Sequence, residues 1–496
     1  MNELIKKINS ISKDYDVYAV GGFARDLLLK LKHKDIDLVV NNDALKYAKK
    51  VAAALKAKLI TLDEDTETYR IILKDYKISN IDIALFNGKT IEEDLQSRDF
   101  TINAIAFKLK YFENFRKHII FSNKNTLVDL KSKTFDVISE KTFKIDPLRM
   151  LRAFRFISEF IGFNLSNKTL LKIKQNAKLI KSAVPERIKN EFFRILSAQN
   201  SSELLKTMDA CGLLSGIFPE IEKMKKAKKK YYYHPGGLFE HSFETLEFTE
   251  NILINLKTYF PESFIELQEH FYNGESLSEN VTRASLLKFT ALFHDNAKPE
   301  TAKFENGKMR FFEHEDFGAN KLRRIMHSLK FGKRDIETAT FLVRHHMRPS
   351  TLTRNNIVTK KAVLKFFRDI GDSTPDLIVL SMSDWHSYKR LKVFSSKELK
   401  LQKKSVRDLI KKYYELKNTK PLPKFIDGNI IMREFRLKPG PWIGELLNFV
   451  NEAQFDGKVL SKSDALKLVL SKLTHIKKKY KICDEMFKQA IFAGVV

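Results

Sequence analysis

The sequence predicts an α+β chain, in which a strand-containing head precedes an all-helical remainder. Short apolar runs of strand length, such as "VYAV", "DIDLVV" and "NIDIAL", alternate with helical periodicity within residues 1–135. From about residue 136 onward, apolar residues recur at helical spacing, as in "DPLRMLRAFRFISEF". The chain has 496 residues, too many for one hydrophobic core. Several domains are therefore expected.

The head is predicted to contain strands separated by amphipathic helices. Each predicted strand is short and rich in Val, Ile or Tyr, and each predicted helix shows a 3.6-residue apolar period. The strands are expected at residues 17–22, 35–40, 57–62, 69–74 and 80–86. The helices are expected at residues 23–31 and 43–57.

The composition is compatible with a polyanionic partner, either a nucleic acid or an anionic membrane surface. The formal net charge is +28, which suits a polyanion, although a proteome that solvates its surfaces with Lys would also raise it. Cys211 and Cys483 are the two cysteines, which excludes a disulfide framework and a thiolate metal site and favours a reducing compartment. The chain shows no apolar signal core and no run of about 18 apolar residues, so we expect a cytoplasmic protein without a membrane span.

Two aspartates one residue apart are the first candidate site. On a strand, Asp35 and Asp37 project to the same face. Two close carboxylates repel unless cations lie between them, and Mg²⁺ prefers carboxylate oxygens together with substrate phosphates. The pair therefore fits a two-metal phosphoryl or nucleotidyl transfer site. The alternative is a solvated strand end with both charges in water.

The preceding residues favour the metal site. Gly21 and Gly22 lie between a strand and a helix, where a backbone can approach a phosphate closely, and Arg25 follows in the first turns of that helix. This order suits a nucleoside triphosphate whose phosphates reach the metals. Asp82 is a candidate third carboxylate on a neighbouring strand, or else an edge-strand charge.

Further motifs follow in order along the chain. They are "SRDFTINAIAF", "DPLRMLRAFRF", "ERIKNEFFRIL" and the Gly- and Pro-containing segment "IDGNIIMREFRLKPGPWIGELLNFVNEAQFDGKV". With "GGFARD" and "DID", they resemble the class II tRNA nucleotidyltransferases, that is, the CCA-adding enzymes and their bacterial poly(A) polymerase relatives in the polymerase β superfamily.

The resemblance implies a role for each matching residue. Asp35 and Asp37 would hold two Mg²⁺, and Gly21, Gly22 and Arg25 would face the triphosphate. The other implied roles are sugar and phosphate contacts by Arg98 and Asp99, base reading by Asp146 and Arg149, further nucleotide contacts by Arg152 and Arg155, and bracing of the neck helices by Glu186 and Arg187.

The base-reading pair has a physical rationale of its own. Asp146 and Arg149 are three residues apart, so on one helix they would share a face. A carboxylate accepts from the exocyclic amine of cytosine or adenine, and a guanidinium donates to ring nitrogens or a carbonyl. Uracil and guanine present a carbonyl where the carboxylate needs a donor, and each buried group left unpaired costs roughly 1–3 kcal/mol. The alternative is an ordinary surface ion pair.

Three departures from the family pattern bear on specificity. Ile145 stands where the base-selecting motif usually begins with Glu, and Ser97 replaces the first Arg of the second motif. The interval "NGKTI" before the second motif is short. A longer loop here is typical of CCA-adding members, and shortening is a feature of members that add the two cytidines alone. Addition of CC is therefore an alternative to addition of CCA.

Histidines and aspartates in the middle of the chain form a second candidate site. The stretches "GGLFEHSFETLEF", "KFTALFHDNAKP", "FFEHEDFGA", "VRHHMRP" and "LSMSDWHS" resemble pieces of an HD-superfamily metal phosphohydrolase. Imidazole and carboxylate ligands from separate helices hold a divalent metal that activates water. The resemblance assigns the ligands to His241, His294, Asp295 and Asp384, with His314, His345 and His346 as candidates for a second metal. The metal would be a divalent ion such as Mn²⁺, Ni²⁺ or Mg²⁺.

The resulting prediction is a polymerase-β-type nucleotidyltransferase head over residues 1–135, a helical neck over 136–222, an HD domain over 223–395 and a helical C-terminal body over 396–496. The leading function is addition of CCA to the 3′ end of tRNA from CTP and ATP. The alternatives are a CC-adding enzyme, a poly(A) polymerase, chiefly an HD phosphohydrolase, or a pure RNA-binding protein. The stretch "KKAKKKYYY" fits either RNA contact or a solvated linker, and the oligomeric state is left open between monomer and homodimer.

Overall fold

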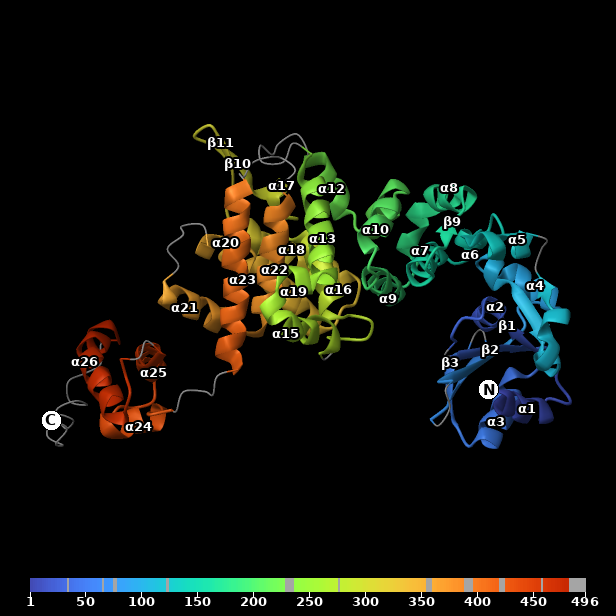
Figure 1. The fold of residues 1–496 in the computed structure, drawn as a ribbon, viewed down its shortest axis with the longest axis horizontal. Coiled ribbons are helices and arrows are strands. Elements are labelled where there is room, and N and C mark those ends of the chain that lie inside the picture. Colours follow the sequence, from blue (N-terminus) through green and yellow to red (C-terminus); the bar gives the residue numbers. More distant parts are fainter. Residues whose placement is uncertain are drawn as a thin grey trace. The chain divides into compact units, whose positions relative to one another are not determined.

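The computed structural model describes residues 1–33, 35–64, 67–74, 78–121, 125–227, 236–274, 277–353, 359–387, 396–418, 424–455 and 458–480 (Figure 1). The chain divides into two compact units, Met1–Thr351 with Pro375–Val406 and Leu352–Thr374 with Arg407–Val496. None of the described helices is long and apolar enough to cross a membrane. The finer division into four domains stays a prediction. Most of "KKAKKKYYY", and Cys483, lie outside the described residues.

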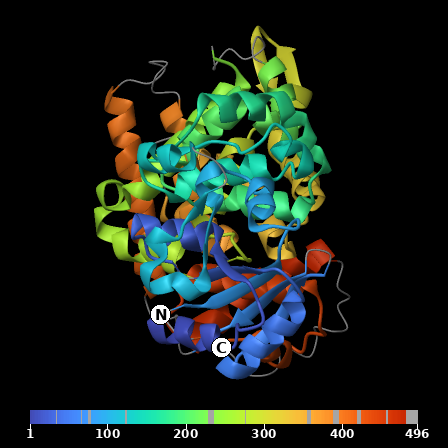
Figure 2. The ribbon, with the colours of Figure 1, turned by 90° about the vertical axis from the view of Figure 1, so that its right-hand side faces the viewer.

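A seven-stranded mixed sheet, blue in Figure 2, forms the core of the head. The strand order is β3-β4-β5-β2-β1-β6-β7, in which β2 and β5 run parallel and the other neighbours run antiparallel. The predicted strands are present, and β6 and β7 are additional. The bounds are β1 Val17–Val20, β2 Asp35–Val40, β3 Lys58–Asp63, β4 Thr68–Ile72, β5 Asn80–Leu85, β6 Ile105–Lys108 and β7 Ile120–Phe121.

The register of the central strands brings carboxylates together. In the parallel pair, Asp35 lies opposite Asn80 of β5 and Asp37 lies opposite Asp82. The alternate residues Ile36 and Leu38 are buried in the core. Asp82 therefore lies on an interior strand beside Asp37, and not on a sheet edge.

Helices flank the sheet and determine where the glycine pair lies. Helix α2 begins at Gly21 itself, directly after β1, so that both glycines belong to its first turn. Asp43 caps the N-terminus of α3 by accepting a hydrogen bond from the backbone N–H of Lys46. The bounds are α1 Asn2–Ser10, α2 Gly21–Leu29, α3 Ala44–Leu55, α4 Ile91–Ser97 and α5 Asn125–Ser132.

The neck is helical apart from a two-residue pairing of β8 Thr134–Phe135 with β9 Asn164–Leu165. Pro185 occupies the first turn of α9, where its missing N–H costs no hydrogen bond. A cluster of aromatic rings, in which Phe135 stacks on Phe156 and other phenylalanines pack at steeper angles, fills the space between α7 and the end of the head. The helices are α6 Thr142–Ile145, α7 Arg149–Glu159, α8 Asn167–Asn176, α9 Pro185–Leu196, α10 Ser201–Ala210, α11 Leu213–Ile217 and α12 Glu220–Lys226.

The region of the scattered histidines is a bundle of helices with one projecting hairpin. A capping box between Thr282 and Ser285 starts α16, whose side chains are all buried except the first. The hairpin pairs β10 Ala302–Glu305 with β11 Lys308–Phe311. The helices are α13 Leu238–Ile254, α14 Leu256–Tyr259, α15 Phe264–Gln268, α16 Arg283–Phe293, α17 Lys298–Thr301, α18 His314–Ser328, α19 Lys333–His345, α20 Met347–Thr353 and α22 Thr374–Ser387.

The second unit has a small core of its own. Leu446 and Val450 of one helix pack with Val469 and Leu473 of another. Asp427 caps α24 by accepting from the backbone N–H of Ile430. The helices are α21 Lys360–Ile370, α24 Gly428–Glu434, α25 Pro441–Phe455 and α26 Lys462–Tyr480, while α23 Ser396–Asn418 begins in the first unit.

Candidate functional site

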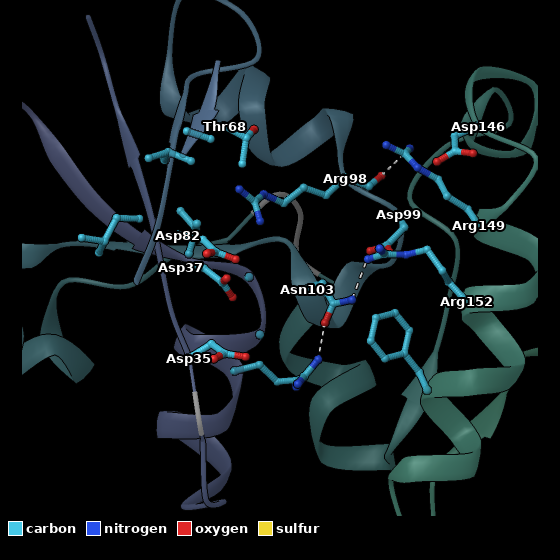
Figure 3. A pocket seen from close by; sticks show the side chains of 18 of the residues that line it. Asp35, Asp37, Thr68, Asp82, Arg98, Asp99, Asn103, Asp146, Arg149 and Arg152 are labelled. Carbon is cyan, nitrogen blue, oxygen red and sulfur yellow. Dashed lines mark hydrogen bonds and ion pairs between the residues drawn. The ribbon is translucent and has the colours of Figure 1, made fainter. Parts of the chain in front are cut away.

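A cavity of about 630 Å³ lies between the sheet of the head and the first long helix of the neck. Figure 3 shows carboxylates from the strands on one side and arginines on the other. The expected metal- and nucleotide-binding residues of the head and neck all line it: Gly21, Gly22, Arg25, Asp35, Asp37, Arg98, Asp99, Asp146, Arg149, Arg152 and Arg155. Residues far apart in the sequence thus meet at one place.

The carboxylates of the head form a cluster with unbalanced charge. Burial and the neighbouring carboxylates of Asp82 and Asp35 raise the pKa of Asp37 to about 6, although Arg98 opposes this. Asp35 accepts a hydrogen bond from the Asn80 side chain at 2.9 Å. A divalent cation would relieve this repulsion, so Asp35 and Asp37 fit a metal that takes oxygen ligands.

Asp82, the possible third carboxylate, has a partner of its own. Arg70 of β4 donates two hydrogen bonds to it, from Nε to Oδ1 at 2.8 Å and from a terminal nitrogen to Oδ2 at 2.7 Å. The sequence reading did not consider Arg70. The register between β4 and β5 places Arg70 directly opposite Asp82, so the guanidinium and the carboxylate meet on the same face of the sheet.

Two features require glycine at position 21, namely the backbone conformation and the closeness of the Arg98 side chain. Its φ is +62°, which side chains other than glycine rarely adopt, and a Cβ here would lie 2.8 Å from a guanidinium nitrogen of Arg98. That guanidinium is held by Asp94 of α4, with hydrogen bonds of 2.8 and 3.0 Å to Oδ2. The glycine therefore leaves room for an oriented cation at the edge of the cavity.

Buried Asp99 and half-buried Arg152 form an ion pair. Arg152 approaches Oδ2 of Asp99 at 2.8 Å, and Asn103 donates to Oδ1 at 3.1 Å. Burial by itself would raise the pKa of Asp99, but Arg152 and Asn103 outweigh it and leave the pKa below its usual value. Asp99 thus positions Arg152. Asn103, which was not predicted from the sequence, links this pair to Arg25, because its side-chain oxygen accepts a hydrogen bond from the Arg25 guanidinium.

Two of the expected nucleotide contacts are tied to protein carboxylates. Arg25 is buried and pairs with Asp26 at 2.7 Å. Arg155 pairs with Glu159 and with Glu191 of α9, each at 2.7 Å. The contact from Arg155 to Glu191 fastens α7 to α9 beside the cavity. A direct contact of either arginine with a nucleotide stays a prediction.

The expectation that Asp146 and Arg149 share one helix is wrong. Asp146 is extended, with φ −138° and ψ +100°, and α7 begins at Arg149. The reason is Pro147, which disfavours helical geometry in the residue before it. Asp146 instead caps this turn, because its Oδ1 accepts from the backbone N–H of Leu148 at 3.0 Å. Both side chains still line the cavity (Figure 3).

The two residues expected to brace the neck differ in their surroundings. Arg187 of α9 lies 3.3 Å from Oδ2 of Asp146, so it orients the proposed base reader. Glu186 is exposed in the first turn of α9. Bracing by either residue stays a prediction.

The second candidate site is a buried cluster of imidazoles and carboxylates. Nε2 of His241 lies 3.1 Å from Nε2 of His294, 3.1 Å from Oδ2 of Asp295 and 3.3 Å from Oδ1 of Asp384. On the other side, Nε2 of His314 lies 3.4 Å from Oδ1 of Asp295. His346 is 3.6 Å from the same oxygen. His345, the remaining candidate, makes an edge-to-face contact with Phe341 and belongs to no group of candidate metal ligands among the described residues.

The tautomers of these imidazoles suit metal binding. A backbone carbonyl lies 2.7–2.8 Å from Nδ1 of each of three imidazoles, those of His294, His314 and His346. A carbonyl oxygen only accepts hydrogen bonds, so each Nδ1 carries the hydrogen and donates it. Nδ1 of His241 is 2.9 Å from Ser387, whose hydroxyl already donates to a carbonyl and therefore accepts. In each case Nε2 is left to face the centre, which is the arrangement of metal-bound histidines.

Unsatisfied polar atoms point into this cluster. Oδ1 of Asp295, Oδ1 of Asp384 and Nε2 of His314 are buried and have no hydrogen-bond partner among the described residues. Burial would lower the pKa of His294, yet Asp295 and Asp384 outweigh it and raise the pKa far above its usual value. The carboxylates thus attract a positive charge that a divalent cation would supply. Two ligand groups result, His241–His294–Asp384 and His294–Asp295–His346.

Models of known protein families match the regions of the chain that contain both candidate sites. The poly(A) polymerase head domain matches residues 17–135, and the RNA- and SrmB-binding site of polymerase A matches residues 162–225. The HD domain matches residues 238–388, and tRNA nucleotidyltransferase domain 2 matches residues 317–470. The chain belongs to the tRNA nucleotidyltransferase and poly(A) polymerase family, and it carries an HD domain.

Members of this tRNA nucleotidyltransferase family resemble the chain over most of its length. A CC-adding tRNA nucleotidyltransferase of Thermus thermophilus is 28% identical, with 92% of this chain and 93% of the relative covered. An A-adding tRNA nucleotidyltransferase of Deinococcus radiodurans is 26% identical, with coverage of 90% and 93%. The Thermotoga maritima CCA-adding enzyme, solved with tRNA, has a TM-score of 0.62, 23% identity and 95% coverage of both chains, and so shows the same fold.

Proposed function

We propose that this chain is a tRNA nucleotidyltransferase that adds C and A to the 3′ end of tRNA from CTP and ATP, without a nucleic acid template. The observation that carries the proposal is the single cavity in which Asp35 and Asp37 face a set of arginines, with Asp146 and Arg149 at its neck side. The whole-length relatives add CC or A to tRNA, and solved proteins of the same fold contain ATP, CTP or tRNA. The +28 net charge also suits a tRNA partner.

The residues divide the work of nucleotidyl transfer. The 3′-hydroxyl of tRNA attacks the α-phosphorus of the nucleotide, the bond to the β-phosphate breaks, and pyrophosphate leaves. Asp35 and Asp37 would hold divalent cations, with Mg²⁺ as the proposed ion. When bound, such ions supply charge stabilisation at the attacking and departing oxygens. Arg98, held by Asp94, and Arg152, held by Asp99, face the triphosphate as preoriented donors.

Base selection is assigned to Asp146 and Arg149. Replacing Asp146 with Ala removes the acceptor for the exocyclic amine of C and A. The preference for CTP over UTP, measured as a ratio of kcat/KM on a tRNA that lacks CCA, is expected to fall about 5- to 150-fold. Glu203→Ala is the matched control, because Glu203 is an exposed carboxylate of the neck that lies outside the cavity. An unchanged ratio in the Asp146 variant would remove it from base reading.

A second candidate function is addition of CC alone. The specific observation is that residues 86–90 are the whole connection between β5 and α4, which leaves little chain to move beside the cavity. Two tRNA transcripts, one lacking CCA and one lacking the terminal A, distinguish the candidates after incubation with CTP, ATP or both. Growth by three and by one nucleotide supports CCA addition. Growth by two on the first with none on the second indicates CC addition, and long tails from ATP indicate a poly(A) polymerase.

The buried imidazole and carboxylate cluster supports a separate phosphohydrolase activity. His241, His294, Asp295 and Asp384 would hold a divalent ion such as Mn²⁺, Ni²⁺ or Mg²⁺, which supplies activation of water when bound. Hydrolysis consumes one water: its oxygen joins phosphorus, and its protons are shared between the phosphate product and the departing alcohol. Asp295 is oriented for this role by an ion pair with Lys298.

Metal content tests the second ligand group. His346→Ala is expected to bind one equivalent of metal fewer than the wild type, because it loses a ligand of the group that includes Asp295. His345→Ala, its sequence neighbour outside the cluster, is expected to keep the full content. The measurement is elemental analysis of protein purified with Mn²⁺. His294→Ala should lose both equivalents that this cluster holds, since His294 belongs to both groups. Equal content in the His346 and His345 variants would contradict a second metal.

The four-domain division and a cytoplasmic location stay parts of this proposal.

A further inference from the structure

Three of the arginines that line the cavity lie around one aromatic ring. The guanidinium carbon of Arg155 is 4.0 Å from the ring centroid of Phe156. Those of Arg152 and Arg25 are 5.4 and 5.9 Å from the same centroid. Each distance is within the range at which a guanidinium is attracted to an aromatic face. Phe156 is 7% exposed and also lines the cavity, so the ring lies where the proposed nucleotide-binding cations of the head and the neck meet.

Other phenylalanines hold this ring in place. Phe135 stacks on Phe156, with 5.4 Å between the ring centroids and 7° between the ring planes. Phe100 meets Phe156 almost at a right angle, at a centroid distance of 5.9 Å, and both of these neighbours are fully buried. Phe160 adds a second ring beside Arg25, whose guanidinium carbon is 4.3 Å from its centroid. The orientation of the Phe156 ring is therefore fixed by contacts with uncharged groups.

An aromatic ring offsets repulsion between neighbouring cations in a way that a carboxylate does not. Burial and the charge of Arg152 lower the pKa of Arg155, although Glu191 and Glu159 oppose this. A further carboxylate beside the cavity would attract the arginines but would also repel a triphosphate. The negative face of a phenyl ring attracts a guanidinium and carries no net charge. It can therefore hold the cations without weakening their attraction for an anion.

We propose that Phe156 is a positioning residue for nucleotide binding, because its ring orients three arginines toward the triphosphate and adds no anion beside it. The inference rests on the proposed nucleotidyl transfer, in which these arginines contact the nucleotide. Preoriented donors bind a charged group more tightly than mobile ones, since less side-chain freedom is lost on binding. The proposed base readers, Asp146 and Arg149, are not part of this arrangement, so the choice of base should not depend on the ring.

Ring fluorination tests this inference while nearly preserving the shape of the side chain. Phe156 is replaced in the full-length protein by phenylalanine that carries one, two or three ring fluorines, which progressively weaken the negative face. The Kd for CTP, measured by titration calorimetry with Mg²⁺, is expected to rise at each step and to be roughly tenfold higher with three fluorines. The same rise is expected for inorganic tripolyphosphate, which has no base. A Kd that does not depend on the number of fluorines would overturn the proposal.

Phe163 is the matched control, because it belongs to the same aromatic cluster. Its ring packs on Phe135 and Phe160, whereas the three guanidiniums lie over Phe156 or Phe160. Fluorination of Phe163 is expected to leave the Kd for CTP unchanged. An equal rise in both series would overturn the role of the cations and indicate a general effect of aromatic packing.

Phe156→Leu separates positioning from packing. Phe156→Leu and Phe163→Leu both lose ring contacts and should both lower the Tm, but the Kd for tripolyphosphate is expected to rise in the Phe156 variant alone. Lowered Tm values with an unchanged Kd in both variants would assign Phe156 to packing and overturn the proposal. The ratio of the Kd values for CTP and UTP should stay at its wild-type value. A changed ratio would show that the ring acts on base reading and not on the phosphates.

Binding by the wild type distinguishes failure of this inference from failure of the proposed function. If the wild type binds CTP and tripolyphosphate and fluorination of Phe156 has no effect, this inference alone fails. If the wild type binds neither compound, the cavity is not a nucleotide site, and both the proposed function and the role of Phe156 are overturned.

Discussion

Asp37→Asn is expected to lower the rate of 3′-end extension by roughly 10³-fold or more, because it removes a carboxylate that the metal site requires. Extension of a tRNA transcript that lacks CCA, measured on a sequencing gel with Mg²⁺, checks this. Asp14→Asn is the matched control, since Asp14 is an exposed aspartate of the same domain, 81% exposed at its side chain. Retained extension in the Asp37 variant would place the metal site elsewhere.

The same variant is expected to be more stable than the wild type when metal is removed with EDTA. The pKa of Asp37 is about 6 in the folded protein, above the usual value, so the folded state binds this proton more tightly than the unfolded state. Ionisation therefore destabilises the fold as pH rises through the interval from the usual value to about 6. Removing the charge should add on the order of 3 kcal/mol at pH 8 and little at pH 4. Thermal unfolding at both pH values measures this, and a lower Tm at pH 8 would contradict it.

Lys288→Met is expected to destabilise the first unit by about 3–5 kcal/mol, because it leaves Glu250 buried without its cation. Lys288 is 3% exposed and Glu250 4%. The ammonium group lies 3.0 Å from Glu250 and donates to the carbonyls of Leu196 and Ala198 at 2.9 and 2.7 Å. This cation thus fastens the end of α9 in the neck to α13 and α16 of the histidine-containing bundle.

A double variant separates the buried charge from lost packing. In the wild type, the Glu250 carboxylate accepts hydrogen bonds from the backbone N–H groups of Ser201 and Ser202. Glu250→Gln in the Lys288→Met background keeps an oxygen acceptor at this place but removes the charge. Its Tm is expected to recover toward the wild type. Lys257→Met, which changes an exposed lysine, should leave the Tm unchanged. A double variant as unstable as Lys288→Met would show that packing and not charge is responsible.

Several parts of the fold could be predicted because they depend on local periodicity. The predicted strands of the head follow from two-residue alternation, which also places Asp35 and Asp37 on one face. The helices of the neck and the histidine-containing bundle follow from apolar spacing. The order of the motifs along the chain predicted that the expected nucleotide-binding residues share a site. In the structure these residues line one cavity.

Other features depend on pairing across the chain, which no local pattern encodes. The bond from Arg70 to Asp82 requires the register of β4 on β5, and the contact between Arg155 and Glu191 requires the packing of α7 on α9. Pro147 disfavours helical geometry at Asp146, and this local effect outweighs the helical spacing between Asp146 and Arg149.

By itself, the sequence determined the residue types and their local geometry: paired carboxylates on a strand, glycines where a strand gives way to a helix, and histidines with aspartates in separate segments of a helical region. Tertiary structure decided which of these groups carry unbalanced charge. The raised pKa of Asp37 and the unsatisfied Oδ1 of Asp295 both result from burial among neighbours distant in sequence. The physical reason is that electrostatic energy depends on distance in space and on exclusion of water, and both are set when the chain packs.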